Sequence, residues 1–239
     1  HESRPVTLTP QQRGIATLVG ATLDDLKASP RALLIQGVTG SGKTEIYLDA
    51  ADRCIRLGKK SIVMVPEIAL THQTVERFAS RFPGRVAVLH SGLSAGQRFD
   101  QWWKVKRGEY DIVVGSRSAI FGPQPDLGLV VIDEEHEWTY KQQDAAPRYH
   151  ARDVALMLAR LAGAVVLMGS ASPDVTTYHR ALRGRYGLLT LPDRVADAAV
   201  PSSSAPLRTA VVPATPANPD ISPHFAIPSP SVISAKAGP

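Results

Sequence analysis

The feature that most constrains this chain is the octapeptide Gly37-Val38-Thr39-Gly40-Ser41-Gly42-Lys43-Thr44. An apolar run (residues 32–35) precedes it and a helix-compatible stretch (residues 45–57) follows, which is the strand, turn and helix order that a P-loop requires. Its glycines allow successive backbone N–H groups to face phosphate oxygens at a helix N-terminus. In such a loop Lys43 reaches the β- and γ-phosphates and the Thr44 hydroxyl binds Mg²⁺. The sequence therefore predicts an ATP site formed by all eight residues.

The rest of residues 1–194 alternates short apolar runs with longer amphipathic ones. Several of the apolar runs are continuous in Val, Ile and Leu, which is typical of parallel strands covered on both faces. The pattern predicts one α/β domain, a doubly wound parallel sheet of the P-loop NTPase type, with its ligand at the carboxyl ends of the strands. Strands are expected at 32–36, 61–65, 86–90, 111–115, 129–132 and 164–169, and helices at 10–27, 43–57, 68–82, 94–107, 150–161 and 173–182.

The composition changes after Arg194. Nine of the 19 prolines lie in residues 195–239, mixed with Ala, Ser and Val, and Phe225 is the only aromatic residue there. No helical or strand period is visible, so this segment is expected to be a disordered tail rather than a second domain. A truncation, a frameshift or a foreign extension would each explain it.

Charge and cysteine content restrict the class of protein. The formal charge of +5 and the pI near 9.5 suit a polyanionic partner. A single cysteine, Cys54, excludes a disulfide framework and a cysteine-rich zinc site. No basic and apolar leader opens the chain, and the most apolar stretch (residues 154–168) is interrupted by Arg160 and Gly163, which favours a helix followed by a strand. We therefore expect a cytoplasmic protein with no membrane partner.

A second motif lies about ninety residues after the P-loop, where an apolar run ends in Asp133-Glu134-Glu135-His136. A carboxylate at the end of a parallel strand is the partner that a P-loop needs. Asp133 is expected to hold the Mg²⁺ together with Thr44, and Glu134 to deprotonate the attacking water. Lys43, Asp133 and Glu134 are thus the predicted catalytic residues.

A third element is Ser170-Ala171-Ser172, at the end of the last predicted strand. Because the ends of neighbouring parallel strands meet at one crevice, Ser170 and Ser172 can hydrogen-bond His136 there. Such a contact could report the presence of the γ-phosphate to the rest of the protein. The alternative is a structural histidine beside an ordinary turn.

These motifs, in this order, resemble those of the superfamily 2 helicases and, more narrowly, the PriA family of primosomal replication-restart helicases. The family-specific part is Tyr140-Lys141-Gln142 followed by Tyr149-His150-Ala151-Arg152-Asp153-Val154-Ala155. The likeness covers residues 5–194 and implies the first RecA-like lobe of such a motor. The other matching segments are Gly37 to Thr44, Val65-Pro66-Glu67-Ile68-Ala69-Leu70-Thr71, Leu89-His90-Ser91-Gly92-Leu93-Ser94, Gly115-Ser116-Arg117-Ser118-Ala119-Ile120-Phe121 and Asp133-Glu134-Glu135-His136.

The resemblance also implies roles for single residues. Gln12 corresponds to the family's adenine-reading glutamine, although Gln11 beside it leaves the register open. Segment 137–149, named here the aromatic loop, corresponds to the loop that links DNA contact to hydrolysis. Single-stranded or forked DNA is the implied partner, since cationic side chains bind phosphate and aromatic faces stack on bases. The residues implied to contact DNA are His90, Ser91, Arg117, Ser118, Trp138, Tyr140 and Lys141. Of the adjacent Trp102 and Trp103, at least one is expected to lie in the core.

The implied function is ATP- and Mg²⁺-dependent 3′-to-5′ DNA unwinding in replication restart and primosome assembly, with primosome and single-strand-binding proteins as further partners. The family's second lobe, with its arginine finger, and its zinc module are not legible in residues 195–239. We therefore expect a fragment that hydrolyses ATP very slowly by itself. A non-catalytic, nucleotide-dependent DNA- or primosome-binding module and a lobe of another superfamily 2 translocase remain open, and a small-molecule P-loop kinase is a more distant alternative.

Overall fold

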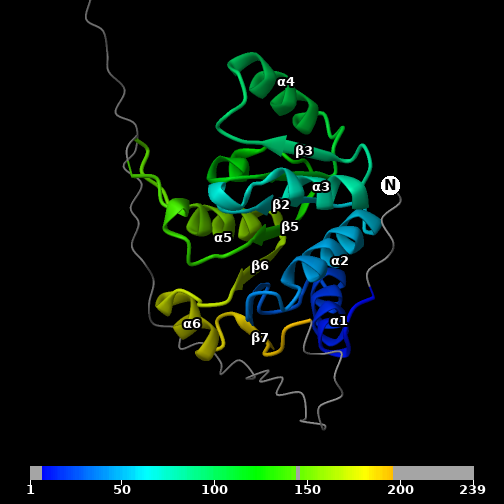
Figure 1. Ribbon diagram of the computed structural model, residues 1–239, viewed down its shortest axis with the longest axis vertical. Coiled ribbons are helices and arrows are strands. Elements are labelled where there is room, and N and C mark those ends of the chain that lie inside the picture. Colours follow the sequence, from blue (N-terminus) through cyan, green and yellow to red (C-terminus); the bar gives the residue numbers. More distant parts are fainter. Residues whose placement is uncertain (1–6, 144–145, 196–239) are drawn as a thin grey trace, which may run out of the picture.

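The protein is built around seven parallel strands in the order β3-β4-β2-β5-β6-β1-β7 (Figure 1). The computed structural model describes residues 7–143 and 146–195. The predicted doubly wound parallel sheet is therefore confirmed, whereas the predicted tail lies outside the described residues except for Val195. The strands are β1 (Ala32–Gly37), β2 (Lys60–Met64), β3 (Val86–Leu89), β4 (Ile112–Gly115), β5 (Leu127–Ile132), β6 (Val165–Ser170) and β7 (Gly187–Leu191).

Both faces of this sheet are apolar, which explains the continuous apolar runs. Neighbouring residues of a strand point to opposite faces, so Leu33 and Ile35 join one buried cluster while Leu34 joins the other. The same alternation holds in β5, where Val131 and Ile132 belong to different clusters. Each strand therefore needs hydrophobic residues at successive positions.

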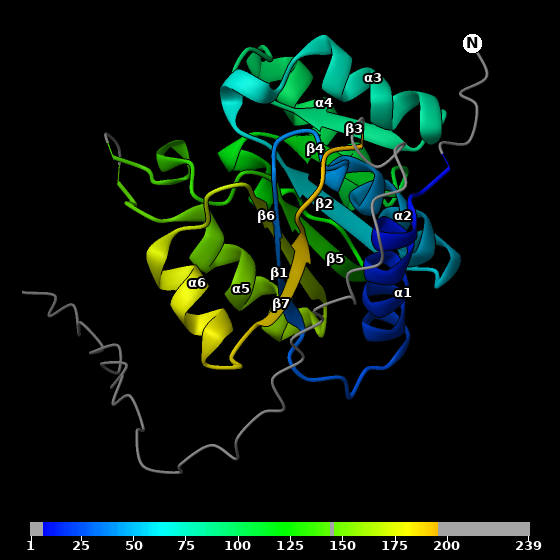
Figure 2. The ribbon, with the colours of Figure 1, turned by 60° about the horizontal axis from the view of Figure 1, so that its bottom comes forward.

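Helices cover both faces of the sheet, and Figure 2 shows α5 and α6 on one side of it and α1 and α2 on the other. Residues of α1, α2 and α3 belong to the first buried cluster, and residues of α4, α5 and α6 belong to the second. This is the three-layer arrangement expected when helices connect parallel strands. The helices are α1 (Pro10–Asp24), α2 (Lys43–Arg56), α3 (His72–Arg81), α4 (Ala95–Lys106), α5 (Ala151–Ala162) and α6 (Val175–Leu182), with 3₁₀ turns η1 (Glu67–Ala69), η2 (Arg117–Phe121) and η3 (Trp138–Tyr140).

Helix boundaries differ from the sequence prediction where capping residues decide them. The predicted start at 68 is wrong, because the Thr71 side chain accepts the N–H of Thr74 and begins α3 at His72. Helix α1 ends at Asp24 rather than at 27, since the chain at Asp25 is already extended. The stretch 154–168 is a helix end followed by β6, as predicted. Among the described residues, no helix combines the length and the apolarity that a membrane crossing requires.

Strand β7 was not predicted, although it supports the P-loop. It pairs with β1 along its whole length, and the Leu191 carbonyl accepts the N–H of Val38 at 3.3 Å. A Cβ on Gly37 would lie 2.7 Å from Ser41 Oγ and 3.0 Å from Leu191 Cβ, so only glycine fits between them. The P-loop thus begins where the ends of β1 and β7 lie side by side.

Candidate functional site

The P-loop has the conformation of an anion site. Gly40 and Gly42 have φ values of 83° and 80°, in the left-handed region that glycine adopts without strain. Of the backbone N–H groups in residues 39–45, only those of Ser41 and Glu45 donate to an acceptor within the described part of the chain. The free N–H groups are those of Thr39, Gly40, Gly42, Lys43 and Thr44. Phosphate oxygens are the natural acceptors for such a set.

Lys43 is buried inside this loop. Its Nζ donates to the Gly37 carbonyl at 2.9 Å and lies 3.7 Å from Glu134 Oε1. The P-loop and the Asp-Glu motif, far apart in the sequence, therefore meet around one ammonium group. The sequence prediction placed both motifs at the same crevice, and the geometry agrees with it.

Asp133 is a partly buried acid that directly follows β5. Its Oδ1 accepts a 3.0 Å hydrogen bond from the Tyr47 hydroxyl, and its backbone carbonyl accepts one from Tyr140. Burial, reinforced by the Glu134 charge, raises the pKa of Asp133 above its ordinary range. A divalent cation beside this carboxylate would offset both effects, so the position suits a metal ligand.

Glu134 is one of two non-glycine residues with positive φ in the described chain, at 45°. This left-handed backbone places its carboxylate near both Lys43 and His136; the distance from Glu134 Oε2 to His136 Nδ1 is 3.6 Å. Non-glycine residues in this conformation cluster at active sites. The backbone thus favours the position that the sequence assigned to the general base.

His136 joins the end of β6, as the third motif predicted. Its Nδ1 lies 2.7 Å from Ser170 Oγ, which also accepts the N–H of Ser172 at 3.0 Å. With Nδ1 as acceptor, the serine hydroxyl donates to the imidazole and holds the tautomer protonated at Nε2. Ser172 therefore contributes its backbone to this contact, and Ser170 contributes its side chain.

The structure selects Gln12 over Gln11 as the glutamine beside the nucleotide crevice. Gln12 is buried, its Nε2 donates to the Ser41 carbonyl at 2.8 Å, and its Oε1 accepts the N–H of Thr9. Gln11 instead donates to Asp193 in the segment after β7. Gln12 thus fixes the start of α1 against the P-loop.

Residues of the P-loop, together with Gln12, Asp133 and Glu134, line a cavity of about 450 Å³. Thr44 and Asp133 also border a smaller adjoining space of about 200 Å³, and Arg77 lines both this space and the larger cavity. A hydroxyl, a buried carboxylate and a row of free N–H groups are the donor set that a Mg²⁺–triphosphate needs. The residues present therefore fit ATP with Mg²⁺ held by Thr44 and Asp133.

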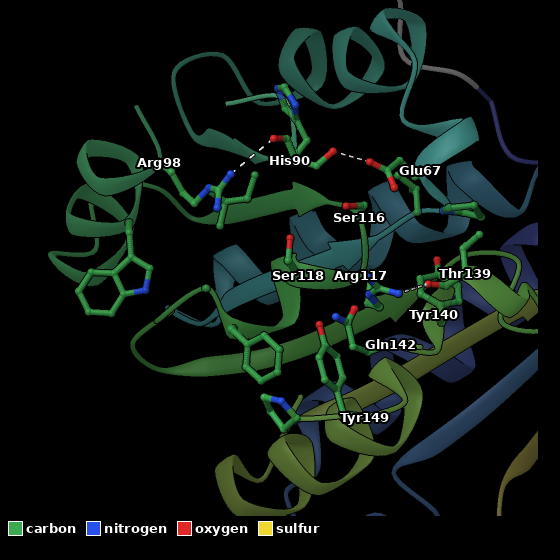
Figure 3. A pocket seen from close by; sticks show the side chains of 18 of the residues that line it. Glu67, His90, Arg98, Ser116, Arg117, Ser118, Thr139, Tyr140, Gln142 and Tyr149 are labelled. Carbon is green, nitrogen blue, oxygen red and sulfur yellow. Dashed lines mark hydrogen bonds between the residues drawn. The ribbon is translucent and has the colours of Figure 1, made fainter. Parts of the chain in front are cut away.

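A second cavity of about 480 Å³ opens at the ends of β2, β3 and β4 (Figure 3). Five of the residues that the sequence assigned to DNA contact line it, namely His90, Ser91, Arg117, Ser118 and Tyr140. Figure 3 shows His90, Arg117 and Ser118 around the same opening as Arg98 and Tyr149. The structure therefore brings separate sequence motifs to one surface cavity.

The aromatic loop forms one wall of this second cavity. Arg117 Nη1 donates to the carbonyls of Thr139 and Lys141, at 3.1 and 2.9 Å, so it holds the loop on both sides of Tyr140 (Figure 3). Tyr140 is 1% exposed. Tyr140 nevertheless lines the cavity, so its implied contact with DNA stays a prediction. Trp138, at 69% exposure, keeps the role assigned to it as a prediction.

The expectation that Trp102 or Trp103 belongs to the core is wrong. Neither ring is buried: the two pack edge to face at 5.3 Å, and Lys106 Nζ lies 5.1 and 4.8 Å from their centroids. Val105 is the residue of α4 that enters the core. Trp102 lines the second cavity beside Arg98.

Comparison with known proteins identifies the family. The family model of the DEAD/DEAH box helicases matches residues 11–181, which include the P-loop, the Asp-Glu motif and the segments between them. The chain belongs to the DEAD/DEAH box helicase family.

Within that family the chain is a homologue of replication restart protein PriA. It is 47% identical to the Bacillus subtilis protein over 203 residues and 45% identical to the Chlamydia pneumoniae protein over 195 residues. These alignments cover 85% and 81% of this chain but only 25% and 26% of the relatives. The chain thus spans about a quarter of the length of the relatives it matches.

Solved structures show the same fold at lower identity. A structure of RecG bound to a three-way DNA junction matches 80% of this chain and 24% of the RecG chain, with a TM-score of 0.57 and 24% identity. The Hef helicase domain of Pyrococcus furiosus matches 79% of this chain and 39% of its own, with a TM-score of 0.52 and 20% identity. The fold is therefore a RecA-like helicase lobe, as predicted.

Two parts of this helicase lobe escaped sequence reasoning. Tyr47 lies one helical turn after Lys43 and holds Asp133, and its position four residues after the P-loop lysine is a signal that could have found it. The second is the buried pair of Glu135 and Arg152. The sequence offers no signal for that pair, because only the tertiary fold brings the two residues together.

Proposed function

We propose that this chain is the ATP-binding lobe of a PriA-like 3′-to-5′ DNA helicase that acts in replication restart and primosome assembly. The observation that carries the proposal is the convergence of Lys43, Asp133 and Glu134 on one cavity. The bound nucleotide would supply the phosphoryl group, and Mg²⁺ would neutralise its charge.

Each residue of the crevice has its own role in hydrolysis. Lys43 leaves the Gly37 carbonyl to contact the β- and γ-phosphates, while the loop N–H groups hold the remaining oxygens. Thr44 and Asp133 hold the metal. Glu134 accepts the proton of the attacking water, since its carboxylate is fixed between an ammonium group and an imidazole.

Single-stranded DNA is proposed to follow the second cavity. Arg98 supplies positive charge there, and His90 and Ser118 supply polar contacts without base-specific geometry. Trp138 stands exposed on the aromatic loop and offers a stacking face. The RecG structure contains that protein bound to a three-way DNA junction, which supports a nucleic-acid partner for this fold. Primosome proteins and single-strand-binding proteins are further proposed partners, and a cytoplasmic, nucleoid-associated location belongs to the same proposal.

Hydrolysis by this lobe alone is proposed to be slow. In the family an arginine finger from the second lobe completes the site, and such a residue contributes about 10³ to 10⁵ in rate. Among the described residues, Arg77 is the arginine that lines the nucleotide cavity, and its guanidinium is paired with Glu45 at 2.7 Å. The crevice is therefore built to bind before it is completed for catalysis.

Fluorescent ATP titrations of the 239-residue chain test the proposal. Mg²⁺-dependent binding that is lost in Lys43→Ala, and retained with hydrolysis abolished in Glu134→Gln, supports it. Equal hydrolysis by Glu134→Gln removes Glu134 as the base. DNA-stimulated turnover of about 1 s⁻¹ or faster contradicts the need for a second lobe. Binding without measurable hydrolysis even over hours favours the non-catalytic module, and phosphate transfer to a metabolite favours a kinase.

A further inference from the structure

A buried ion pair lies directly behind the proposed catalytic residues. Arg152 Nη1 donates to Glu135 Oε2 at 2.7 Å, and the two side chains are 12% and 0% exposed. Neither residue lines the nucleotide cavity. A fully buried carboxylate is costly unless it is paired and hydrogen-bonded, and Glu135 meets both conditions.

The Glu135 carboxylate connects three elements. Its Oε1 accepts the N–H of Asp174 at 2.7 Å, and its Oε2 accepts the Thr177 hydroxyl at 3.0 Å in addition to Arg152. Asp174 and Thr177 belong to the start of α6, and Arg152 belongs to the first turn of α5. Glu135 therefore ties the end of β5 to both helices that follow.

The same pair closes the aromatic loop at its base. Glu135 lies just before residues 137–149 and Arg152 just after them, so the loop leaves and returns at one buried contact. A bridge between Lys141, in the loop, and His150, just after it, holds the two arms together. The N–H of Gln142 also donates to the carbonyl of Tyr149, at 2.8 Å. The buried ion pair of Glu135 and Arg152 therefore fixes the base of the aromatic loop.

Glu134 is held in its left-handed conformation by its two neighbours. The N–H of Asp133 donates to Met64 and the N–H of Glu135 donates to Gly169, both at 2.9 Å. The Glu135 side chain adds the anchor to α5 and α6 described above. Because a non-glycine residue at positive φ persists only where its surroundings enforce it, these anchors are what keep the base in place.

We propose that Glu135 and Arg152 are positioning residues for hydrolysis: their buried ion pair holds the backbone on which Glu134 stands, and thereby the direction of the general base. This inference rests on the proposed ATPase function. The pair acts through Glu134, so its loss lowers the rate of hydrolysis and leaves ATP binding by the P-loop unchanged.

Single-turnover hydrolysis of labelled ATP by the 239-residue chain tests the inference. In Glu135→Gln we expect the rate to fall by about tenfold to a hundredfold, as for a catalytic group misplaced by about 1 Å, with the ATP dissociation constant within about twofold of the parent. Arg152→Gln gives the same split. The double variant, in which no unpaired charge is left buried, is expected to be no slower than either single variant, because both changes remove one contact.

Controls separate positioning from simple destabilisation. Ile112→Val removes one buried methyl group from β4, far from the pair in the sheet, and is expected to lower the melting temperature without changing the rate. If Glu135→Gln does not fold, the neutral double variant carries the measurement. A parent chain that does not hydrolyse ATP refutes the proposed function itself. A parent that hydrolyses ATP, loses hydrolysis in Glu134→Gln and keeps its full rate in the folded double variant refutes the positioning role alone.

Discussion

The hydroxyl of Tyr140 donates a 2.7 Å hydrogen bond to the backbone carbonyl of Asp133. Tyr140 forms part of the wall of the proposed DNA cavity, and Asp133 lines the nucleotide cavity. One buried side chain therefore touches both proposed sites. A movement of the aromatic loop cannot leave the end of β5, the proposed metal site, unaffected while this contact persists.

Tyr140→Phe tests that connection, because it keeps the buried ring and removes only the hydrogen bond. We expect ATP affinity without DNA to stay within about twofold. The change that single-stranded DNA makes in ATP affinity should shrink, by up to the whole coupling of about 1–3 kcal/mol that linked sites commonly show. Titrations of ATP with and without an oligonucleotide measure both quantities. Tyr149→Phe, in the same cavity, is the control, and an unchanged coupling in Tyr140→Phe would show that its hydroxyl transmits nothing.

The raised pKa of Asp133 predicts a dependence of stability on pH. Burial first, and the Glu134 charge second, place the folded pKa above the ordinary value of about 3.9. The stabilisation from this carboxyl group is complete below the unfolded pKa and is lost as the pH rises through the folded one. At a pH above the folded pKa the metal-free protein therefore holds an ionised group at a cost.

Asp133→Asn should remove that cost. Without Mg²⁺ we expect the variant to melt above the parent at pH 7, with about 2–4 °C for each 1 kcal/mol gained in a chain of this size. The difference should narrow as the pH falls toward the unfolded pKa. Calorimetric scans at pH 7 and pH 5 measure it, and the variant should lose Mg²⁺-dependent ATP binding. A parent that melts above the variant at pH 7 would contradict the raised pKa of Asp133.

Trp138→Ala tests the stacking face of the aromatic loop. Removal of a stacked aromatic residue costs about 1–3 kcal/mol per base, so single-stranded DNA affinity should fall at least about fivefold. Leu161→Ala is a matched control, since its side chain is 78% exposed on α5. Fluorescence anisotropy with a labelled oligonucleotide gives both values. If the two variants bind DNA equally well, Trp138 does not stack on a base.

Gly169 and Gly14 give opposite expectations for the same substitution. A Cβ on Gly169 would fall on the Tyr47 hydroxyl that holds Asp133, whereas one on Gly14 meets nothing within 4 Å. Gly169→Ala should therefore destabilise the fold by about 1–3 kcal/mol and weaken Mg²⁺–ATP binding. Gly14→Ala, inside α1, should stabilise it by about 0.5–1 kcal/mol. Urea unfolding of both variants checks the signs, and a neutral Gly169→Ala would show that Tyr47 has room to move.

Sequence patterns were sufficient where function requires a local motif. The P-loop, β5 with its Asp-Glu end and the strands of the sheet centre carry their own signals, because both the apolar runs and the glycine turn are contiguous. Strand β7 was missed because it is a short edge strand whose identity depends on pairing with β1. The hydrogen bond from the Val38 N–H to the Leu191 carbonyl is visible only in the fold.

Side-chain exposure was the less predictable quantity. Tyr140 and Trp138 are two residues apart in one aromatic segment, yet the first is buried and the second exposed. The difference follows from Arg117, which holds the loop from another strand end. Likewise, the sequence alone indicates that Glu135 is a third acid in a polar turn, whereas in the fold α5 places Arg152 against it. Tertiary partners decide these positions, and a single sequence does not reveal them.

The most direct test is a crystal structure of the chain with Mg²⁺ and a non-hydrolysable ATP analogue. We expect the β- and γ-phosphates to lie on the free N–H groups of the P-loop. We also expect Lys43 to have left the Gly37 carbonyl, and the metal to lie between Thr44 and Asp133. An empty crevice, or a nucleotide whose metal lies far from Asp133 and Glu134, would contradict the proposed ATP site.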